Sequence, residues 1–198
     1  MLTNGNKSSI ISYSDVLVEG CSVAMTKEAV LKKLLAAYSD HYDLDPQTPS
    51  PFHASATYYL RDENYLVSRK HVLSALEQHE YVYFFLCEYL DVSTLETQIA
   101  RSMEVGMSRI SPHKEHMSSY VTLIILADHI APEAGILLQK IKYRKYFRLA
   151  FHGWMEYHIA AMEVSTKRFL SNRAGREARR TLELNFGSKG KRKGVQTQ

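Results

Sequence analysis

Two uninterrupted apolar runs constrain the fold of this chain more than any other feature. Tyr81–Cys87 and Tyr120–Ala127 are rich in aromatic and β-branched side chains and lack the polar alternation of a half-exposed strand. Each run is therefore predicted to be a buried strand in the middle of a sheet. The longer run has 8 residues, which is too short to span a bilayer, since a helix needs about 20. No membrane partner is expected.

Helices are predicted where capping residues precede an apolar face. A hydroxyl or carboxylate before a helix can accept a hydrogen bond from a free N–H of its first turn, and proline suits the first helical position. The last of the four helices is predicted to run to about Leu184. In chain order, the start signals are Thr26, the capping box Ser93/Glu96, Pro132, and Ser165 or Thr166.

The remaining strands are predicted to form two hairpins. The first covers Ala54–Lys70, with a polar turn at Arg61–Asn64. A short helical or turn stretch is expected around Val72–Gln78. The second hairpin pairs Tyr146–His152 with Met155–Val164, although part of the latter segment also fits a helix.

The order is then helix, three strands, helix, strand, helix, two strands, helix. This order predicts a single α+β domain in which helices pack on a mostly antiparallel sheet of five to six strands. The domain is expected at residues 26–186, after a disordered or additional segment 1–25 and before a disordered basic tail 187–198. The alternative is an α/β restriction-endonuclease-like core with a degenerate site, because the opening elements have that order; order alone does not define function.

A nuclease of that fold would need a specific carboxylate and lysine pattern. Two carboxylates hold Mg²⁺, and a lysine two positions after one of them stabilises charge. No lysine in this chain has Asp or Glu two positions before it, so the motif is missing. The nuclease reading would gain support only if the carboxylates near the strands converge in space: Asp62, Glu63, Glu80, Glu88 and Asp128.

Other catalytic motifs are also incomplete. His113 and His116 could bind zinc together with His152 or His158, but the H-E-x-x-H frame is absent. Cys87 lies in the most apolar strand, where a thiol packs inertly. The chain has no glycine-rich phosphate loop and no nucleophile elbow. We therefore predict no catalytic residue, no metal and no cofactor.

Charge is divided unevenly along the chain. Residues 1–139 carry 10 Lys+Arg and 17 Asp+Glu, whereas residues 140–198 carry 15 and 4. Such asymmetry can mark a phosphate-binding end or a solubilising tail on a dipolar body. Any nucleic-acid binding is predicted to be weak, non-specific and carried by the basic end. The candidate residues, the first three expected on the outer face of the last helix, are Arg173, Arg176, Arg180, Lys189, Lys191, Arg192 and Lys193.

The second predicted hairpin is rich in aromatic residues. Phe147, Phe151, Trp154 and Tyr157 can leave an apolar face or an open edge, which a homodimer would cover. Basic residues lie among these aromatics, and such a mixture can stack bases and hold phosphates, although alternating aromatics are more often core residues. The basic residues are Arg144, Lys145 and Arg148.

Three blocks, 80–85, 116–122 and 152–156, resemble an uncharacterised bacterial domain family of Gram-positive anaerobes. The resemblance covers about Met25–Leu184 and implies a bacterial cytoplasmic protein of unknown function, without catalytic residues to transfer. The two cysteines, Cys21 and Cys87, argue against a disulfide framework and favour the cytoplasm. The preferred function is a non-enzymatic binding or interaction module. The alternatives are a divergent metal-dependent nuclease-like enzyme and a non-specific nucleic-acid-binding protein.

Overall fold

Seven strands form one mixed sheet in the computed structural model, which describes residues 25–63 and 75–187. The spatial order is β1-β2-β3-β4-β6-β5, and β7 also pairs with β6. In chain order the elements are α1 (Lys27–Tyr38), β1 (Asp43–Leu44), β2 (Ala54–Glu63), β3 (Ala75–Leu90), α2 (Val92–Arg109), β4 (His116–Ile130), α3 (Pro132–Lys140), β5 (Arg144–Tyr146), β6 (Trp154–Glu163), β7 (Arg168–Ser171) and α4 (Arg176–Phe186).

The predicted α+β class is confirmed, with one domain and helices packed on the sheet. Four of the six strand pairings are antiparallel, and the two central ones, β3–β4 and β4–β6, are parallel. These two connections contain α2 and α3, which carry the chain back across the sheet as a parallel crossover requires. The two apolar runs lie in this parallel centre, and their segments Tyr81–Leu86 and Val121–Ala127 are buried throughout.

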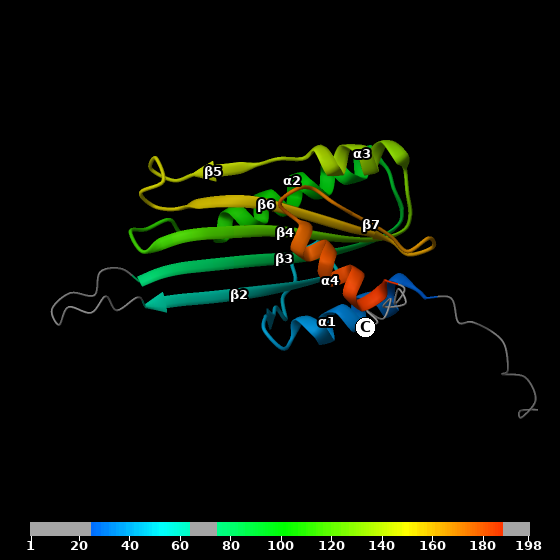
Figure 1. The fold of residues 1–198 in the computed structure, drawn as a ribbon, viewed down its shortest axis with the longest axis horizontal. Coiled ribbons are helices and arrows are strands. Elements are labelled where there is room, and N and C mark those ends of the chain that lie inside the picture. Colours follow the sequence, from blue (N-terminus) through cyan, green and yellow to red (C-terminus); the bar gives the residue numbers. More distant parts are fainter. Residues whose placement is uncertain (1–24, 64–74, 188–198) are drawn as a thin grey trace, which may run out of the picture.

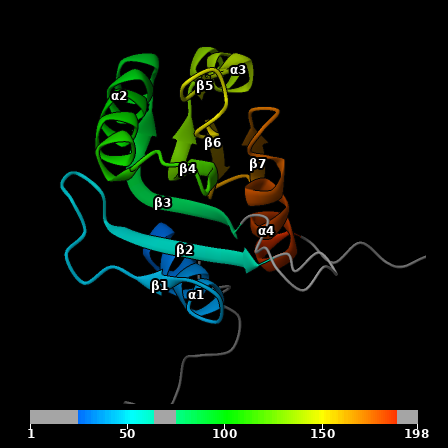
Figure 2. The same ribbon diagram turned by 90° about the vertical axis from the view of Figure 1, so that its left-hand side faces the viewer.

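The core has two layers, one on each face of the sheet. On one face, α2 and α3 contribute Leu95, Ala134 and Leu138 to a cluster with the odd-numbered side chains of the central strands. On the other face, α1 and α4 contribute Leu34 and Leu182 to a cluster with the even-numbered side chains. Figure 2 places α2 and α3 together on one side of the sheet and α1 on the other. Covering both faces explains why the central strands are continuously apolar.

The prediction of the last helix is wrong at its beginning. The helix starts at Arg176 rather than at Ser165 or Thr166, because Lys167 has a φ of 55° and closes a tight turn between β6 and β7. The hydroxyl of Ser165 donates to the carbonyl of Asp128 instead of capping a helix. Residues 167, 168 and 173 are consequently not helical.

The second hairpin is shorter than predicted. Its first strand is Arg144–Tyr146, and a left-handed turn follows in which Arg148, Leu149 and Ala150 all have positive φ. Such a turn cannot continue a strand. The returning strand was correctly predicted as β6, and its strand form excludes the helical alternative.

Four further predictions can be compared with the structure. Thr26 caps α1, accepting from the N–H of Ala29 at 3.2 Å. The capping box is wrong, because Asp91 caps α2 and accepts from the N–H of Thr94 at 2.7 Å. Residues 61–63 continue β2 instead of turning, and residues 75–78 belong to β3 instead of a helix or turn.

Several expectations lie outside the described residues. They are the strand at 65–67, the leader before Met25 and the tail after Gly187, which includes Lys189, Lys191, Arg192 and Lys193. Among the helices of the described ranges, none is long and apolar enough to cross a membrane.

Candidate functional site

Helices α1 and α4 cover only one half of their sheet face. Their side chains pack on two cross-strand rows, Phe84, Ile124 and Ala160, and Leu86, Leu126 and Met162. In Figure 1, strands β2 to β6 extend well beyond these two helices, toward the left of the view. Because side chains alternate between faces, the same face continues at every second residue of each strand.

Beyond the helices this face becomes polar and aromatic. Its central row crosses five strands, with Tyr58 opposite Glu80, Glu80 opposite Tyr120, Tyr120 opposite Glu156, and Glu156 opposite Arg144. The next row toward the helices adds Thr122 and His158. The next row away from the helices adds Ser118, Trp154 and Tyr146. We call these ten residues the polar half-face.

The carboxylate of Glu80 is fixed by two hydroxyl donors. Tyr42 donates to one oxygen at 2.7 Å, and Thr122 donates to the other at 2.6 Å. Burial, with the nearby Glu80 charge, raises the pKa of Tyr42, so its hydroxyl keeps its proton. A carboxylate offers about four lone-pair sites, so Glu80 can accept further hydrogen bonds while it holds this position.

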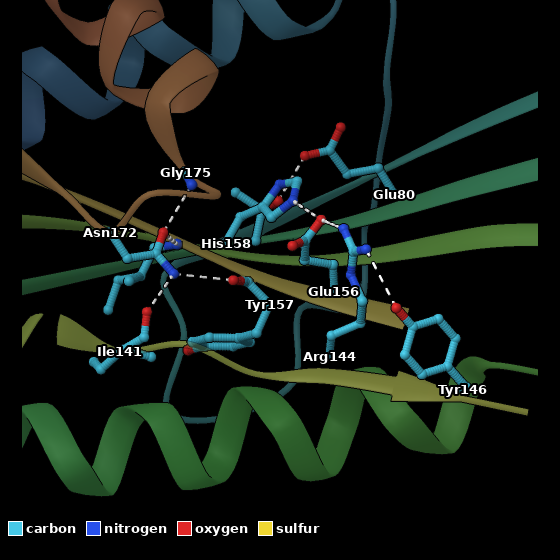
Figure 3. A network of polar contacts seen from close by, with 11 residues as sticks. Glu80, Ile141, Arg144, Tyr146, Glu156, Tyr157, His158, Asn172 and Gly175 are labelled. Carbon is cyan, nitrogen blue, oxygen red and sulfur yellow. Dashed lines mark hydrogen bonds and ion pairs between the residues drawn. The ribbon is translucent and has the colours of Figure 1, made fainter. Parts of the chain in front are cut away.

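Glu156 joins the sheet face to the edge strand β5. The guanidinium of Arg144 donates to the Glu156 carboxylate at 2.7 Å and to the Tyr146 hydroxyl at 3.5 Å (Figure 3). The hydrogen bond to Glu156 raises the pKa of Arg144. His158 lies 3.9 Å from Glu156, and burial lowers the pKa of its imidazole despite the opposing pull of the two carboxylates. The ring of His158 stacks on Tyr120 with centroids 4.8 Å apart.

Two buried polar atoms of the half-face have no hydrogen-bond partner. They are the hydroxyl oxygen of Ser118 and the indole Nε1 of Trp154. These residues are cross-strand neighbours on β4 and β6, and Ser118 is fully buried. Buried polar groups are normally satisfied, so this pair is an exception that needs an explanation.

A cleft of about 770 Å³ opens at the β5 end of the half-face. Arg144, Tyr146 and Glu156 belong to both the cleft and the half-face. The cleft lining also includes cationic, aromatic and amide side chains from the end of α3 and from the α3–β5 and β7–α4 connections: Gln139, Lys140, Lys142, Tyr143, Asn172 and Arg173. Its volume lies within the range of about 300–1,000 Å³ that is usual for small-ligand sites.

The cleft is rich in unpaired positive charge. Lys140, Lys142 and Arg173 are exposed and have no ion-pair partner within the described part of the chain. Arg144 is paired with the lining carboxylate, Glu156. The cleft can therefore attract an anion and give it several donors.

Asn172 builds one wall of this cleft. Its amide nitrogen donates to the carbonyls of Ile141 and Tyr157, and its amide oxygen accepts from the N–H groups of Ile159 and Gly175 (Figure 3). All four hydrogen-bonding positions of the amide are used. The side chain thus fills the gap along β6 between its two partners, β5 and β7.

Gly175 has a separate packing requirement at the same place. A Cβ atom at this position would lie 2.4 Å from the carbonyl oxygen of Ile159. The glycine lets the start of α4 approach β6 closely, and this approach fixes the position of the preceding residue pair, Arg173 and Ala174, in the cleft lining.

The structure divides the predicted phosphate-binding residues. Arg173 lies in the cleft, on the loop before α4, whereas Arg176 and Arg180 are exposed on α4 outside the cleft lining. On the same helix, Leu182 packs inward and is fully buried. The lysines of the tail lie outside the described residues.

The carboxylates proposed for a nuclease do not come together. Glu80 and Glu88 are eight residues apart on β3, which is about 26 Å along a strand. Asp128 lies near Glu88 at the far end and pairs with Lys27 at 2.5 Å. The side chain of Asp62 is outside the description, although its backbone pairs with Leu76, still farther from Glu88.

The histidines proposed for zinc lie in two places and do not form a metal site. The ring of His116 contacts His113, with centroids 6.3 Å apart, and bonds to the carbonyl oxygen of His152 at 2.7 Å. His158 belongs to the polar half-face and stacks on Tyr120. Within residues 25–63 and 75–187, no three His, Cys, Asp or Glu side chains are arranged to hold a metal ion.

Cys87 behaves as predicted for a packed thiol. It is free and half-buried, and burial raises its pKa to about 11. The thiolate is the reactive form, so this side chain is a weak nucleophile at neutral pH. Cys21 lies outside the described residues.

Sequence reasoning missed the residues that shape the cleft. Lys140 ends α3, Lys142 and Tyr143 follow it without any motif, and only the fold brings them into one cleft with Arg173. Asn172 had a local signal, since asparagine often bonds to a backbone N–H a few residues later, and Gly175 lies three residues on. The signal shows a turn but not a binding site.

The chain belongs to a family described as Domain of unknown function (DUF8052), whose model matches residues 26–184. This match confirms the resemblance to an uncharacterised domain family and its extent along the chain. No curated protein and no solved structure matches the chain. Function therefore has to be inferred from the site itself.

Proposed function

We propose that this protein is a non-enzymatic binding module and that its ligand carries phosphate groups. The phosphate binds in the cleft, between Lys140 and Lys142 on one side and Arg173 on the other. We place the protein in the bacterial cytoplasm. The observation that carries the proposal is the group of three unpaired cations around one cleft.

The composition of the cleft favours an anion over an apolar ligand. Lysine and arginine donate charge-assisted hydrogen bonds to phosphate, which are stronger than neutral ones. Tyr143 and Tyr146 are 41% and 55% exposed at the same cleft. Exposed aromatic rings beside cations suit a ligand that has a planar or ring-shaped part next to its phosphate.

Isothermal titration calorimetry with pyrophosphate tests the proposal. We expect wild-type protein to bind, and the double variant Lys142→Ala/Arg173→Ala to bind at least tenfold more weakly. Both side chains are exposed, so the fold should be unchanged by circular dichroism. Affinity should also fall with added salt, because the contacts are ionic.

The matched control is Lys32→Ala/Lys114→Ala, which removes the same charge from exposed positions on α1 and before β4. This control should retain wild-type affinity. An equal loss in both double variants would mean that net charge, and not the cleft, attracts the anion. Absence of pyrophosphate binding by the wild type would overturn the proposal.

Non-specific nucleic-acid binding is the second candidate function. It is favoured by Arg176 and Arg180, which are exposed on α4 near the cleft loop and have no ion-pair partner in the described ranges. Duplex DNA should bind weakly, with a log–log salt slope of about −0.9 per phosphate neutralised. Arg176→Ala/Arg180→Ala should reduce that slope and leave pyrophosphate affinity unchanged. An unchanged slope would contradict this candidate.

We also propose a homodimer, in which the contact surface is smaller than the hairpin aromatics of the sequence suggest. Of the four hairpin aromatics, Phe151 is 80% exposed, beside Leu149 at 89%, while Tyr157 is buried. The adjacent cations Arg144 and Lys145 oppose pairing of two β5 edges, because like charges repel. A dimer would therefore use the hairpin tip. Phe151→Ser should then yield a monomer by light scattering; a wild-type monomer at high concentration would refute the dimer.

A further inference from the structure

We propose that the polar half-face binds the sugar hydroxyls of the same ligand, so that the ligand is a phosphorylated ribose such as a ribonucleotide. This inference rests on the proposed function, since the phosphate in the cleft places the sugar. The geometry that carries it is the contact between the two surfaces, which share Arg144, Tyr146 and Glu156.

The half-face offers carboxylates in an arrangement that suits hydroxyl groups. Glu80 and Glu156 lie on either side of Tyr120 in one cross-strand row, and both are half-buried. Neighbouring strands are about 4.8 Å apart, so the two backbones are about 10 Å apart across β4. Carboxylates accept hydrogen bonds from sugar hydroxyls, as acidic residues do from ribose in dinucleotide-binding domains.

Both carboxylates are held in place before any ligand arrives. Glu80 is fixed by Tyr42 and Thr122, and Glu156 by Arg144. Each carboxylate keeps lone pairs that these donors do not use. A rigid acceptor loses little conformational entropy on binding, which favours affinity.

A second, independent observation concerns Ser118 and Trp154, which lie in the row next to that of Glu80, Tyr120 and Glu156. Ser118 and Trp154 each bury a polar atom without a partner, next to Tyr146 of the cleft and one row from Glu156. Leaving such atoms unpaired costs about 1–3 kcal/mol each. Tyr83 and Gln98 also bury an unpaired oxygen elsewhere in the described residues, so the pair supports the inference only through its place beside the Glu156 row. A ligand, or water ordered by it, that reaches this row could supply the missing bonds.

The aromatic rings favour a compact ring over a flexible chain. Trp154 lies beneath the guanidinium of Arg144 at 6.0 Å, and Tyr120 is paired with His158. These contacts place aromatic rings near the junction with the cleft. A sugar ring can rest on such a surface while its hydroxyls reach the carboxylates and its phosphate enters the cleft.

Calorimetric titration with AMP and 2′-deoxyAMP tests the inference. The two probes differ by one hydroxyl and have the same phosphate and base. We expect wild-type protein to bind AMP at least fivefold more tightly than 2′-deoxyAMP. Ribose 5-phosphate should retain most of the affinity for AMP, because the sugar and phosphate make the proposed contacts. Ribose 5-phosphate that binds no more tightly than pyrophosphate would overturn the sugar assignment.

Glu156→Gln separates hydroxyl recognition from charge. The amide can still accept from Arg144, so the contact with β5 is kept, while the charged acceptor for the sugar is lost. We expect the preference for AMP over 2′-deoxyAMP to fall to less than twofold, and pyrophosphate to bind as well as or better than to wild type, because the cleft becomes more positive. Glu80→Gln should weaken the same preference, and Glu96→Gln, an exposed change on α2, should leave it intact.

The outcomes distinguish this inference from the proposed function. Equal binding of AMP and 2′-deoxyAMP, with pyrophosphate still bound, would overturn the sugar site and leave the anion cleft. A preference for AMP that survives both glutamate variants would also overturn it. Failure of the wild type to bind pyrophosphate, AMP and ribose 5-phosphate would overturn the proposed function together with the inference.

Discussion

The two halves of one sheet face differ in what covers them. Under α1 and α4, the row Phe84, Ile124 and Ala160 is entirely buried and apolar. Four residues earlier on the same strands, the row Glu80, Tyr120 and Glu156 is polar and only half-buried. The strands are continuous across the two halves, so the change lies in the side chains and not in the backbone.

The comparison separates residues that hold the fold from residues that are free for another role. The covered half gains stability by removing apolar area from water, at about 25 cal/mol per Å². In the uncovered half, hydrogen bonds such as those of Glu80 replace contacts that water could also make, so each contributes about 1 kcal/mol. Changes in the two halves should therefore affect stability unequally.

The largest expected effect is in the covered half. Ile124→Ala removes a fully buried side chain between α1 and the sheet, and should cost about 2–5 kcal/mol of unfolding free energy. Thr122→Ala, two residues earlier on the same face, removes a donor to Glu80 and should cost about 1 kcal/mol. Urea unfolding measures both. Equal losses would contradict the division into two halves.

Asn172 should give an intermediate effect, because it supports the cleft from within the sheet. Asn172→Ala leaves the backbone groups of Ile141, Tyr157, Ile159 and Gly175 without their partner. The net cost should be about 2–3 kcal/mol, below four full penalties, because water can enter the vacated space and bond to part of these groups.

Anion affinity should fall in parallel, since the cleft wall is lost. The control is Asn185→Ala, whose amide donates one hydrogen bond within α4 and should change stability far less. A stable Asn172→Ala protein with normal pyrophosphate binding would show that Asn172 is needed neither for the fold nor for the cleft.

The smallest expected effect is the pH dependence due to His158. Burial lowers the pKa of this imidazole below its usual 6.5 in the folded protein, and the positive charge of Arg144 acts in the same direction. As the pH falls through 6.5, the unfolded chain takes up a proton before the folded one does. Stability is therefore lost on acidification.

His158→Gln should reduce the loss of unfolding free energy between pH 7.5 and 5.5, measured by urea unfolding. His41→Gln, an exposed change after α1, serves as control. A variant that loses as much stability as the wild type over this interval would show that His158 does not carry the effect.

The sequence predicted the covered half well and the polar half poorly. Val30, Leu34 and Tyr38 have helical spacing, and the structure buries all three. Apolar periodicity reports burial directly. The polar half has no such signal, because Tyr58, Glu80 and Tyr120 become neighbours only through the strand register.

Left-handed backbone explains the differences at the last helix and at the second hairpin. Lys167 and the run Arg148–Ala150 adopt left-handed conformations that are rare for residues other than glycine. Nothing in their side chains signals a turn, so the sequence suggested a helix and a longer strand there. The cleft depends on both of these regions through β5 and β7, which is why its lining could not be predicted.

The most direct test of the central claim is a nuclear magnetic resonance titration of ¹⁵N-labelled protein with AMP. The claim is that the cleft and the polar half-face form one ligand site, which the covered half does not share. We expect amide shifts in residues 139–146, 154–158 and 172–175, and little change in α1 or in residues 84–86. Shifts confined to α1, α2 or the exposed face of α4, with residues 139–146 and 172–175 unchanged, would contradict the account.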